Sequence, residues 1–168
     1  MTLTLILMRH AKSSWDDPSL EDFARPLNGR GRKSARALGE WLRRQGTLPD
    51  EVLISTARRT LETWSGMAGD MPKTAEMRSE PALYHASSDT MMLVLKNATA
   101  RSILMIGHNP GICDFAGRLV QGPPDHARFH DYPTGATTVM TFDAPSWQDI
   151  DWGTGAVQAF AVPRELLD

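Results

Sequence analysis

Three apolar segments of the sequence are followed closely by arginine or histidine. The groups concerned are Arg9 and His10 after residues 3–8, Arg58 and Arg59 shortly after Ser55, and His108 after residues 102–107. Arginine presents a planar fork of donors that matches phosphate oxygens and stays charged at any relevant pH. Histidine can be a nucleophile as neutral imidazole, because its pKa is near neutrality and nearby cations lower it. Gathered in one pocket, these side chains could bind a phosphoryl group and attack its phosphorus.

Such an attack would give a phosphohistidine, and hydrolysis of that intermediate by water would complete a reaction in two steps. To catalyse phosphoryl transfer, a protein must mainly position the reacting groups and stabilise the charge on the equatorial oxygens. A zinc site is the rival use of two histidines, but it needs three or four ligands at characteristic spacings. Arginines beside the histidines would also repel a metal cation. We therefore expect no metal and no cofactor.

The sequence predicts alternating strands and helices, and these elements would position the arginines and histidines. Continuous apolar runs predict buried strands at 3–8, 51–56 and 102–107, and weaker patterns predict strands at 74–77, 136–143 and 156–162. Apolar residues at helical spacing predict helices at 32–45, 58–69, 89–98 and 112–120. This alternation predicts an α/β fold, a three-layer α/β/α sandwich with a mostly parallel central sheet. In such sheets ligands bind beyond the carboxyl ends of the strands.

The bulk properties set limits on the class of protein. A chain of 168 residues without a linker or repeat predicts a single domain over residues 1–168. A formal net charge of -2 gives no general attraction to nucleic acid or to acidic membranes, so we expect neither as a partner. The single cysteine, Cys113, allows no internal disulfide and fits a reducing compartment. The apolar start is too short for a signal peptide or a membrane span, so we expect a cytoplasmic protein.

Five segments in order resemble one family. They are LMRHAKSSW, RPLNGRG, STARRTLET, EPALYHAS and MIGHNPG. Together they resemble the histidine phosphatase superfamily, which has a phosphoglycerate-mutase-like fold, and in particular its short phosphohistidine-phosphatase (SixA-like) branch. The resemblance runs from residue 3 to about residue 143.

The resemblance implies a role for each matched residue. His10 matches the nucleophile and Arg9 the neighbouring phosphate-binding arginine. The motif S-x-x-x-R-x-x-x-T begins at Ser55 and ends at Thr63, so its arginine is Arg59. His108 matches the second histidine, a donor to the transferred phosphoryl group. Further candidates for substrate binding are Arg25 in the RPL segment, Ser13 and Ser14.

Other residues near these motifs are assigned no contact with phosphate. Arg58 is expected to form a solvent-exposed salt bridge, and Asp16 would repel phosphate. His85, His126 and His130 are expected to be ordinary loop histidines. The general acid stays open between Glu80, which lies nearest the family's acidic position, and Asp89, which lies near a predicted helix start.

The resemblance implies a metal-independent phosphatase that acts through phospho-His10, with phosphohistidine on a protein as its substrate. Only about ten residues, 69–78, separate the second helix from SEPALY, which predicts an uncapped pocket open to a protein surface. Two alternatives remain: a phosphatase of small phosphoesters, and a non-catalytic module that binds phosphate or a phosphoprotein.

Overall fold

The computed structural model describes residues 1–167 of the chain and shows one six-stranded sheet in the order β3-β2-β4-β1-β5-β6. The strands are β1 (Thr2–Arg9), β2 (Glu51–Ile54), β3 (Glu76–Ser79), β4 (Ser102–Gly107), β5 (Thr137–Asp143) and β6 (Ala156–Ala161). The helices are α1 (Gly29–Gln45), α2 (Arg58–Met67), α3 (Ser88–Lys96), α4 (Gly111–Leu119) and α5 (Pro163–Leu166). Short 3-10 helices occupy parts of the connecting loops, including Asp22–Ala24 and Pro81–Leu83.

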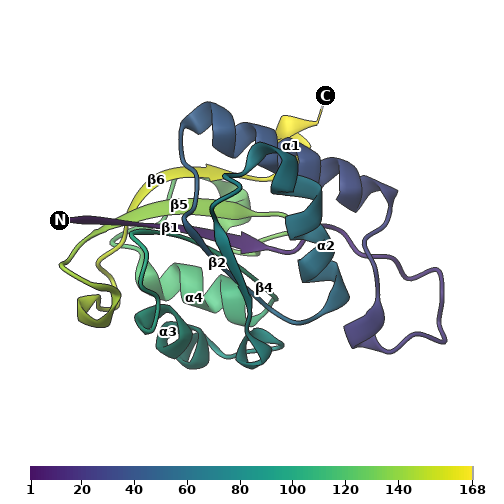
Figure 1. Cartoon of the computed structure of the whole chain (residues 1–168), viewed down its shortest axis with the longest axis horizontal. Coiled ribbons are helices and arrows are strands. Elements are labelled where there is room, and N and C mark those ends of the chain that lie inside the picture. The colour runs from purple at the N-terminus through teal and green to yellow at the C-terminus, as the bar shows by residue number, and fades with distance from the viewer. Residues whose placement is uncertain (168) are drawn as a thin grey trace.

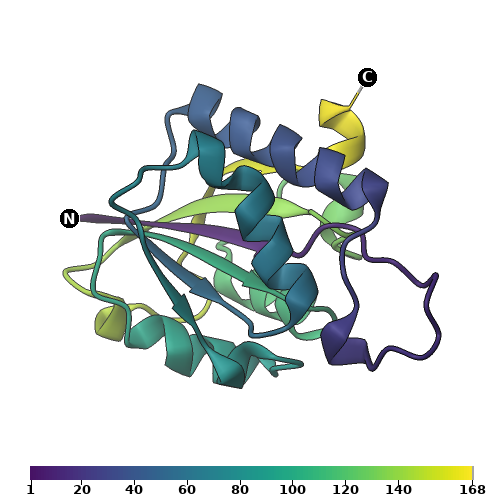
Figure 2. The same ribbon diagram turned by 45° about the vertical axis from the view of Figure 1, so that its right-hand side comes forward.

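Helices cover both faces of the sheet. In Figures 1 and 2, α1 and α2 lie on one face, with α3 and α4 on the other. Alternate residues of β1 point into two separate cores: Leu5 and Leu7 pack on the α3/α4 side, whereas Ile6 and Met8 pack on the α1/α2 side. Full burial of these four side chains explains why the sequence of β1 is continuously apolar. The predicted three-layer α/β/α sandwich is confirmed.

The register of the sheet brings three strand ends together. β1 pairs in parallel with β4, so Arg9 lies opposite Gly107, and β2 pairs in parallel with β4, so Ile54 lies opposite Ile106. β3 is also parallel to β2, whereas β5 and β6 complete the sheet by antiparallel pairing. The residues that follow β1, β2 and β4 therefore emerge at one edge of the sheet.

The predicted elements are all present, with shifted ends. Helix α1 begins at Gly29 rather than at residue 32, because the Asn28 side chain accepts a hydrogen bond from the Gly31 amide at 2.8 Å and caps the helix. The helix ends where predicted, at Gln45, and the following Gly46 adopts a left-handed conformation with φ 71°. The short helix α5 was not predicted. No helix in the described part of the chain is long and apolar enough to cross a membrane.

Candidate active site

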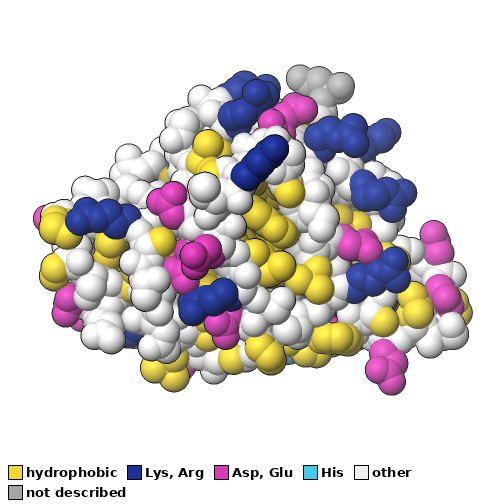
Figure 3. Space-filling view, in the orientation of Figure 1, with side chains coloured by type: hydrophobic (Ala, Val, Ile, Leu, Met, Phe, Trp, Pro, Cys, Tyr) yellow, Lys and Arg dark blue, Asp and Glu magenta, His cyan; other side chains and the backbone are white. Residues whose placement is uncertain are grey.

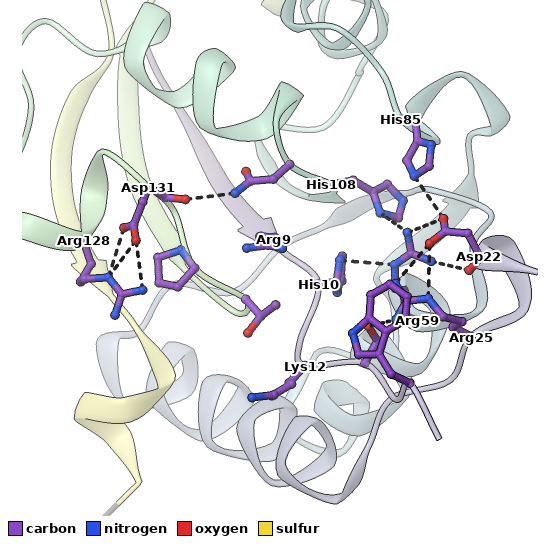
Figure 4. Close-up of a pocket in the computed structure, with 15 residues that line it drawn as sticks. Arg9, His10, Lys12, Asp22, Arg25, Arg59, His85, His108, Arg128 and Asp131 are labelled. Carbon is purple, nitrogen blue, oxygen red and sulfur yellow. Dashed lines mark hydrogen bonds and ion pairs between the residues drawn. The ribbon is translucent and has the colours of Figure 1, made fainter. Parts of the chain in front are cut away.

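A cavity of about 490 Å³ lies at the carboxyl ends of β1 and β4 (Figure 4). The His10 amide donates to the carbonyl of Gly107 at 3.1 Å, and the Ser55 amide donates to that of Ile106 at 3.2 Å, so the sheet ladder continues into the site. The cavity is lined by Arg9, His10, Lys12, Ser13, Trp15, Asp22, Arg25, Arg59, His85, His108, Asn109, Arg128, Asp131, Pro133 and Thr134.

Arg59, on α2, connects the two histidines. Its Nε lies 3.3 Å from Nε2 of His10, and its Nη2 lies 3.3 Å from Nδ1 of His108. Thr63, one turn later on α2, donates its hydroxyl to the Arg59 carbonyl at 2.7 Å and accepts from the Ala11 amide at 3.0 Å. The S-x-x-x-R-x-x-x-T spacing therefore anchors α2 to the loop that carries the first histidine.

His10 is held in the tautomer that a nucleophile needs. Its Nδ1 lies 2.7 Å from the Ala11 carbonyl, which can only accept, so Nδ1 carries the proton. Nε2 then keeps its lone pair, which faces the Arg59 donor. Burial, followed by the charges of Arg9 and Arg59, lowers the pKa of His10 to about 3, against the opposing hydrogen bond to Ala11. His10 is therefore neutral at pH 7.

His108 is neutral as well, and its ring lies beside that of His10 at 5.3 Å between centroids. Arg59 donates to its Nδ1, so its proton sits on Nε2, which donates to Ser55 Oγ at 2.7 Å. Burial, followed by His10 and Arg59, lowers the pKa of His108 to about 3. A bound phosphate dianion would oppose these effects and favour the protonated ring, which can donate to a phosphoryl oxygen.

Arg9 reaches the cavity from the last position of β1. Its Nη1 donates to the carbonyl of Tyr132 at 3.1 Å, while its buried Nε has no partner among the described residues. Burial, followed by repulsion from Arg59, lowers the pKa of Arg9 below its ordinary value. A half-buried guanidinium that lines the cavity is well suited to bind an anion.

Asp22, Tyr84 and His85 form a polar group at the other side of the cavity. Oδ2 of Asp22 accepts from Tyr84 Oη at 2.6 Å and from Arg59 Nη2 at 3.0 Å, and lies 3.2 Å from Nε2 of His85. Burial would raise the pKa of Asp22, but hydrogen bonds from Tyr84 and Arg59 outweigh it and hold that pKa well below its usual range. Asp22 is therefore ionised and can orient the His85 ring.

The prediction that His85 is an ordinary loop histidine is wrong. Its ring stacks on Tyr84 at 4.1 Å between centroids and stands edge-on to His108 at 5.5 Å. Its backbone adopts φ 51°, an unusual conformation for a residue with a side chain. The next residue, Ala86, packs so closely on α4 that a Cβ at Gly111 would collide with its carbonyl oxygen. The loop is thus fixed, and His85 lines the cavity.

Two further predicted residues lie where expected. Ser13 and Arg25 both line the cavity, and Arg25 Nη1 donates to Ser13 Oγ at 2.7 Å. Arg25 also binds Asp22 at 3.2 Å and stacks on Trp15 at 3.6 Å. Arg58 forms the expected exposed ion pair, with Glu62 at 2.7 Å.

Three predicted residues lie outside the cavity lining. The Ser14 hydroxyl accepts from the Asp16 amide at 3.1 Å instead of facing the histidines. The Glu80 carboxylate lies 4.0 Å from Arg78, and Asp89 is exposed and pairs with Arg118 at 3.0 Å. The structure therefore brings neither candidate general acid to His10, since the β3 strand and the α3 helix direct both carboxylates elsewhere.

Metal ligation is not supported by the donor set of the described residues. No group of three or more histidine, cysteine, aspartate or glutamate side chains among residues 1–167 could hold a metal ion. In the cavity, Arg59 occupies the ring nitrogens of both histidines that a metal would require.

The sequence and the fold are similar to those of several known proteins. The chain is 32% identical over 94% of its length, and over 100% of the relative, to an uncharacterized protein of Mycobacterium tuberculosis strain H37Rv. It is 26% identical to the phosphohistidine phosphatase SixA of Escherichia coli, over 89% of this chain and 92% of that one. A solved structure from Nakamurella multipartitia, provisionally assigned as phosphohistidine phosphatase SixA, superposes with a TM-score of 0.84, 26% identity and 97% coverage of both chains. Residues 5–91 match the model of the histidine phosphatase superfamily (branch 1), and the chain belongs to that family.

Proposed function

We propose that this protein is a metal-independent phosphatase that acts through a phosphohistidine on His10 and removes phosphate from phosphohistidine in proteins. One observation carries the proposal: a neutral, buried His10 offers the lone pair of Nε2 to a cavity lined by Arg9, Arg59 and His108. The resemblance of the sequence motifs assigns the same residues to the family's nucleophile and phosphate-binding positions.

In the first step, Nε2 of His10 forms a bond to phosphorus while the bond from phosphorus to the leaving group breaks. Arg9 and Arg59 stabilise the charge on the phosphoryl oxygens, and protonated His108 donates to one of them. Arg59 is preorganised for this role, because its other contacts, with the Asp22 carbonyl at 2.6 Å and carboxylate at 3.0 Å, hold the guanidinium in place. Ser13 and Arg25 complete the border of the site.

The leaving group needs a proton, and His85 is the cavity residue best suited to supply it. Nε2 of His85 lies 3.2 Å from Asp22 Oδ2, so the carboxylate favours a proton on Nε2 and leaves Nδ1 to give or take the transferred proton. In the second step a water attacks phospho-His10, neutral His85 takes the proton of that water, and free phosphate and His10 result. A substrate that leaves as imidazole depends on this acid only in part, because its P–N bond is labile once the ring is protonated.

The preference for phosphohistidine rests on two supports. The chain is similar over most of its length to a protein named for phosphohistidine phosphatase activity. The α2 helix is followed by only a 3-10 helix (Ala68–Asp70) and a short loop before β3, so this connection places no capping domain over the cavity. An uncovered site suits a phosphorylated side chain on a protein surface. Small phosphoesters are the alternative substrates, and a non-catalytic phosphate-binding module is the alternative function.

The test is phosphate release by wild type and His10→Ala, each with and without EDTA. One substrate is a phosphohistidine-bearing protein and the other is p-nitrophenyl phosphate. We expect wild type alone to release phosphate, with no effect of EDTA and with preference for the phosphohistidine protein. A wild type that binds phosphate and hydrolyses neither substrate would contradict the proposal and favour the binding module. Preference for the small ester would overturn the substrate assignment alone.

A further inference from the structure

A smaller cavity, of about 160 Å³, adjoins the catalytic cavity on the side of α1 and α5. Its lining consists of Lys12, Arg30, Ser34, Arg128, Pro133, Thr134, Val162, Pro163 and Arg164. Four of these residues, Lys12, Arg128, Pro133 and Thr134, also line the catalytic cavity. Figure 4 shows Arg128 on the side of the catalytic cavity opposite Asp22. A ligand bound at His10 could therefore extend into the second cavity along the residues that line both cavities.

The lining of this second cavity is cationic. It contains Lys12 and three arginines, and none of its residues is aspartate or glutamate. Arg128 pairs with Asp131 at 3.1 Å, but Lys12 and Arg30 have no carboxylate within 4.0 Å among residues 1–167. Figure 3 shows Lys and Arg side chains spread over α1 on the outer surface as well. The positive potential at this place is thus only partly neutralised by the protein.

Ser34 gives the cavity a buried donor without a protein partner. The residue is 4% exposed, lines the cavity, and its hydroxyl forms no hydrogen bond with the rest of residues 1–167. A serine within a helix can bond to the carbonyl one turn earlier, but the Ser34 hydroxyl forms no such bond. An anion in the cavity would accept from this hydroxyl.

The N-terminus of α1 adds to the same potential. This helix has 17 residues, and its first turn contains no acidic side chain, so its macrodipole is uncompensated there. The backbone of Lys12 is fixed against this turn, because the Asn28 amide donates to the Lys12 carbonyl at 3.0 Å and Gly31 leaves no room for a Cβ. The loop that follows His10 therefore joins the two cavities rigidly.

We propose that the cavity between α1 and α5 is a second anion-binding subsite, which holds a phosphate-sized anionic group carried by the same molecule whose phosphoryl group enters the His10 site. Lys12 and Arg30 provide the charge, and Ser34 provides a directed donor. The link to substrate rests on the proposed function, whereas anion binding does not. The group could be a second phosphate of a small molecule or a carboxylate beside a phosphohistidine.

The test is calorimetric binding of alkane bisphosphonates of increasing length, each compared with the alkyl monophosphonate of the same length. At the length that spans both cavities, we expect wild type to bind the bisphosphonate about tenfold more tightly than the monophosphonate of the same length. Arg30→Ala and Ser34→Ala should each reduce that advantage, by about three- to tenfold. Arg36→Ala is the control: Arg36 is exposed on the same helix but lines neither cavity, so the advantage should persist.

Equal binding of both ligands at every length would overturn the subsite, and so would an advantage that survives both variants. Ser34→Ala removes no protein hydrogen bond, so the variant should fold, as its melting temperature will show. Turnover of phosphohistidine peptides with and without a neighbouring glutamate distinguishes a peptide carboxylate from a second phosphate. If wild type hydrolyses nothing but still prefers the bisphosphonate, the proposed function fails and the subsite stands.

Discussion

Nε of Arg59 lies 3.3 Å from Nε2 of His10, so the lone pair that would attack phosphorus faces a buried cation. This contact aligns the ring, and the charge of Arg59 adds to burial and to the charge of Arg9 in keeping the ring neutral. In the proposed reaction, the phosphoryl group enters between these two residues. Arg59 then exchanges a contact with the nucleophile for contacts with the oxygens of the group under attack.

The Arg59→Lys variant tests whether the planar guanidinium of Arg59, with its several donors, is required. A lysine keeps the charge but offers a point donor, which cannot bind both histidines and Asp22 together. We expect kcat/KM to fall about 100-fold or more, with kcat affected as well as KM. Arg58→Lys is the matched control, since its neighbour Glu62 is outside the cavity lining, and activity should stay within about twofold. Similar losses in both variants would show that only the fold of α2 was damaged.

Replacement of His85 by glutamine tests the proton donor. Glutamine keeps a polar side chain but has no titratable proton, so the loss should depend on the leaving group. We expect a fall of about 100-fold on phenyl phosphate, whose leaving group needs a proton, and a much smaller fall on p-nitrophenyl phosphate. Glu80→Gln should show no such difference. Equal losses on the two esters would assign His85 a structural role.

The two neutral histidines predict a pH-dependent loss of stability in acid. Both have a folded-state pKa of about 3, against an ordinary value of 6.5, so between these values the unfolded chain binds protons that the folded chain does not. Their effect is absent above pH 6.5 and grows as the pH falls towards 3. At pH 5 each histidine should cost about 2 kcal/mol of the free energy of unfolding.

Urea unfolding at pH 7 and pH 5 measures this loss, and the His108→Asn variant serves as the reference. The variant should lose less stability than wild type over the same interval, because it has one fewer histidine to protonate. An identical loss in both proteins would show that His108 does not carry the effect.

Two glycines in the NGRG segment offer a matched pair. A Cβ at Gly31 would collide with the backbone of Lys12, whereas a Cβ at Gly29 would meet only the end of the Arg32 side chain, at 3.6 Å. Gly31→Ala should therefore lower the free energy of unfolding by about 1–3 kcal/mol and reduce activity, because the loop after His10 must move. Gly29→Ala should be neutral or slightly stabilising. Thermal unfolding of both variants would decide, and equal effects would contradict the close approach.

The sequence predicts the sandwich and the principal site residues because both depend on local signals. Buried strands are continuously apolar, and Arg9, His10 and His108 follow such strands directly. Arg59 is found through its spacing from Ser55 and Thr63.

The positions of Asp22 and His85 in the cavity could not be predicted in this way. They are brought together by the 3-10 helix at Asp22–Ala24 and by the loop after Pro81–Leu83, which carry no periodic pattern. Within the segment EPALYHAS, the residue that lines the cavity is His85 and not Glu80. The position of Glu80 in the motif favours it as the acid, but the direction of its side chain depends on the edge strand and on Arg78.

The central claim is that His10 becomes covalently phosphorylated during turnover. Rapid quenching of the wild type with excess phosphohistidine protein, under alkaline conditions that preserve phosphohistidine, followed by peptide mass spectrometry, tests it directly. We predict phosphate on His10 in wild type, accumulating faster than free phosphate, and none in His10→Ala. Steady release of phosphate without any phosphorylated His10, or release that survives in His10→Ala, would contradict the account.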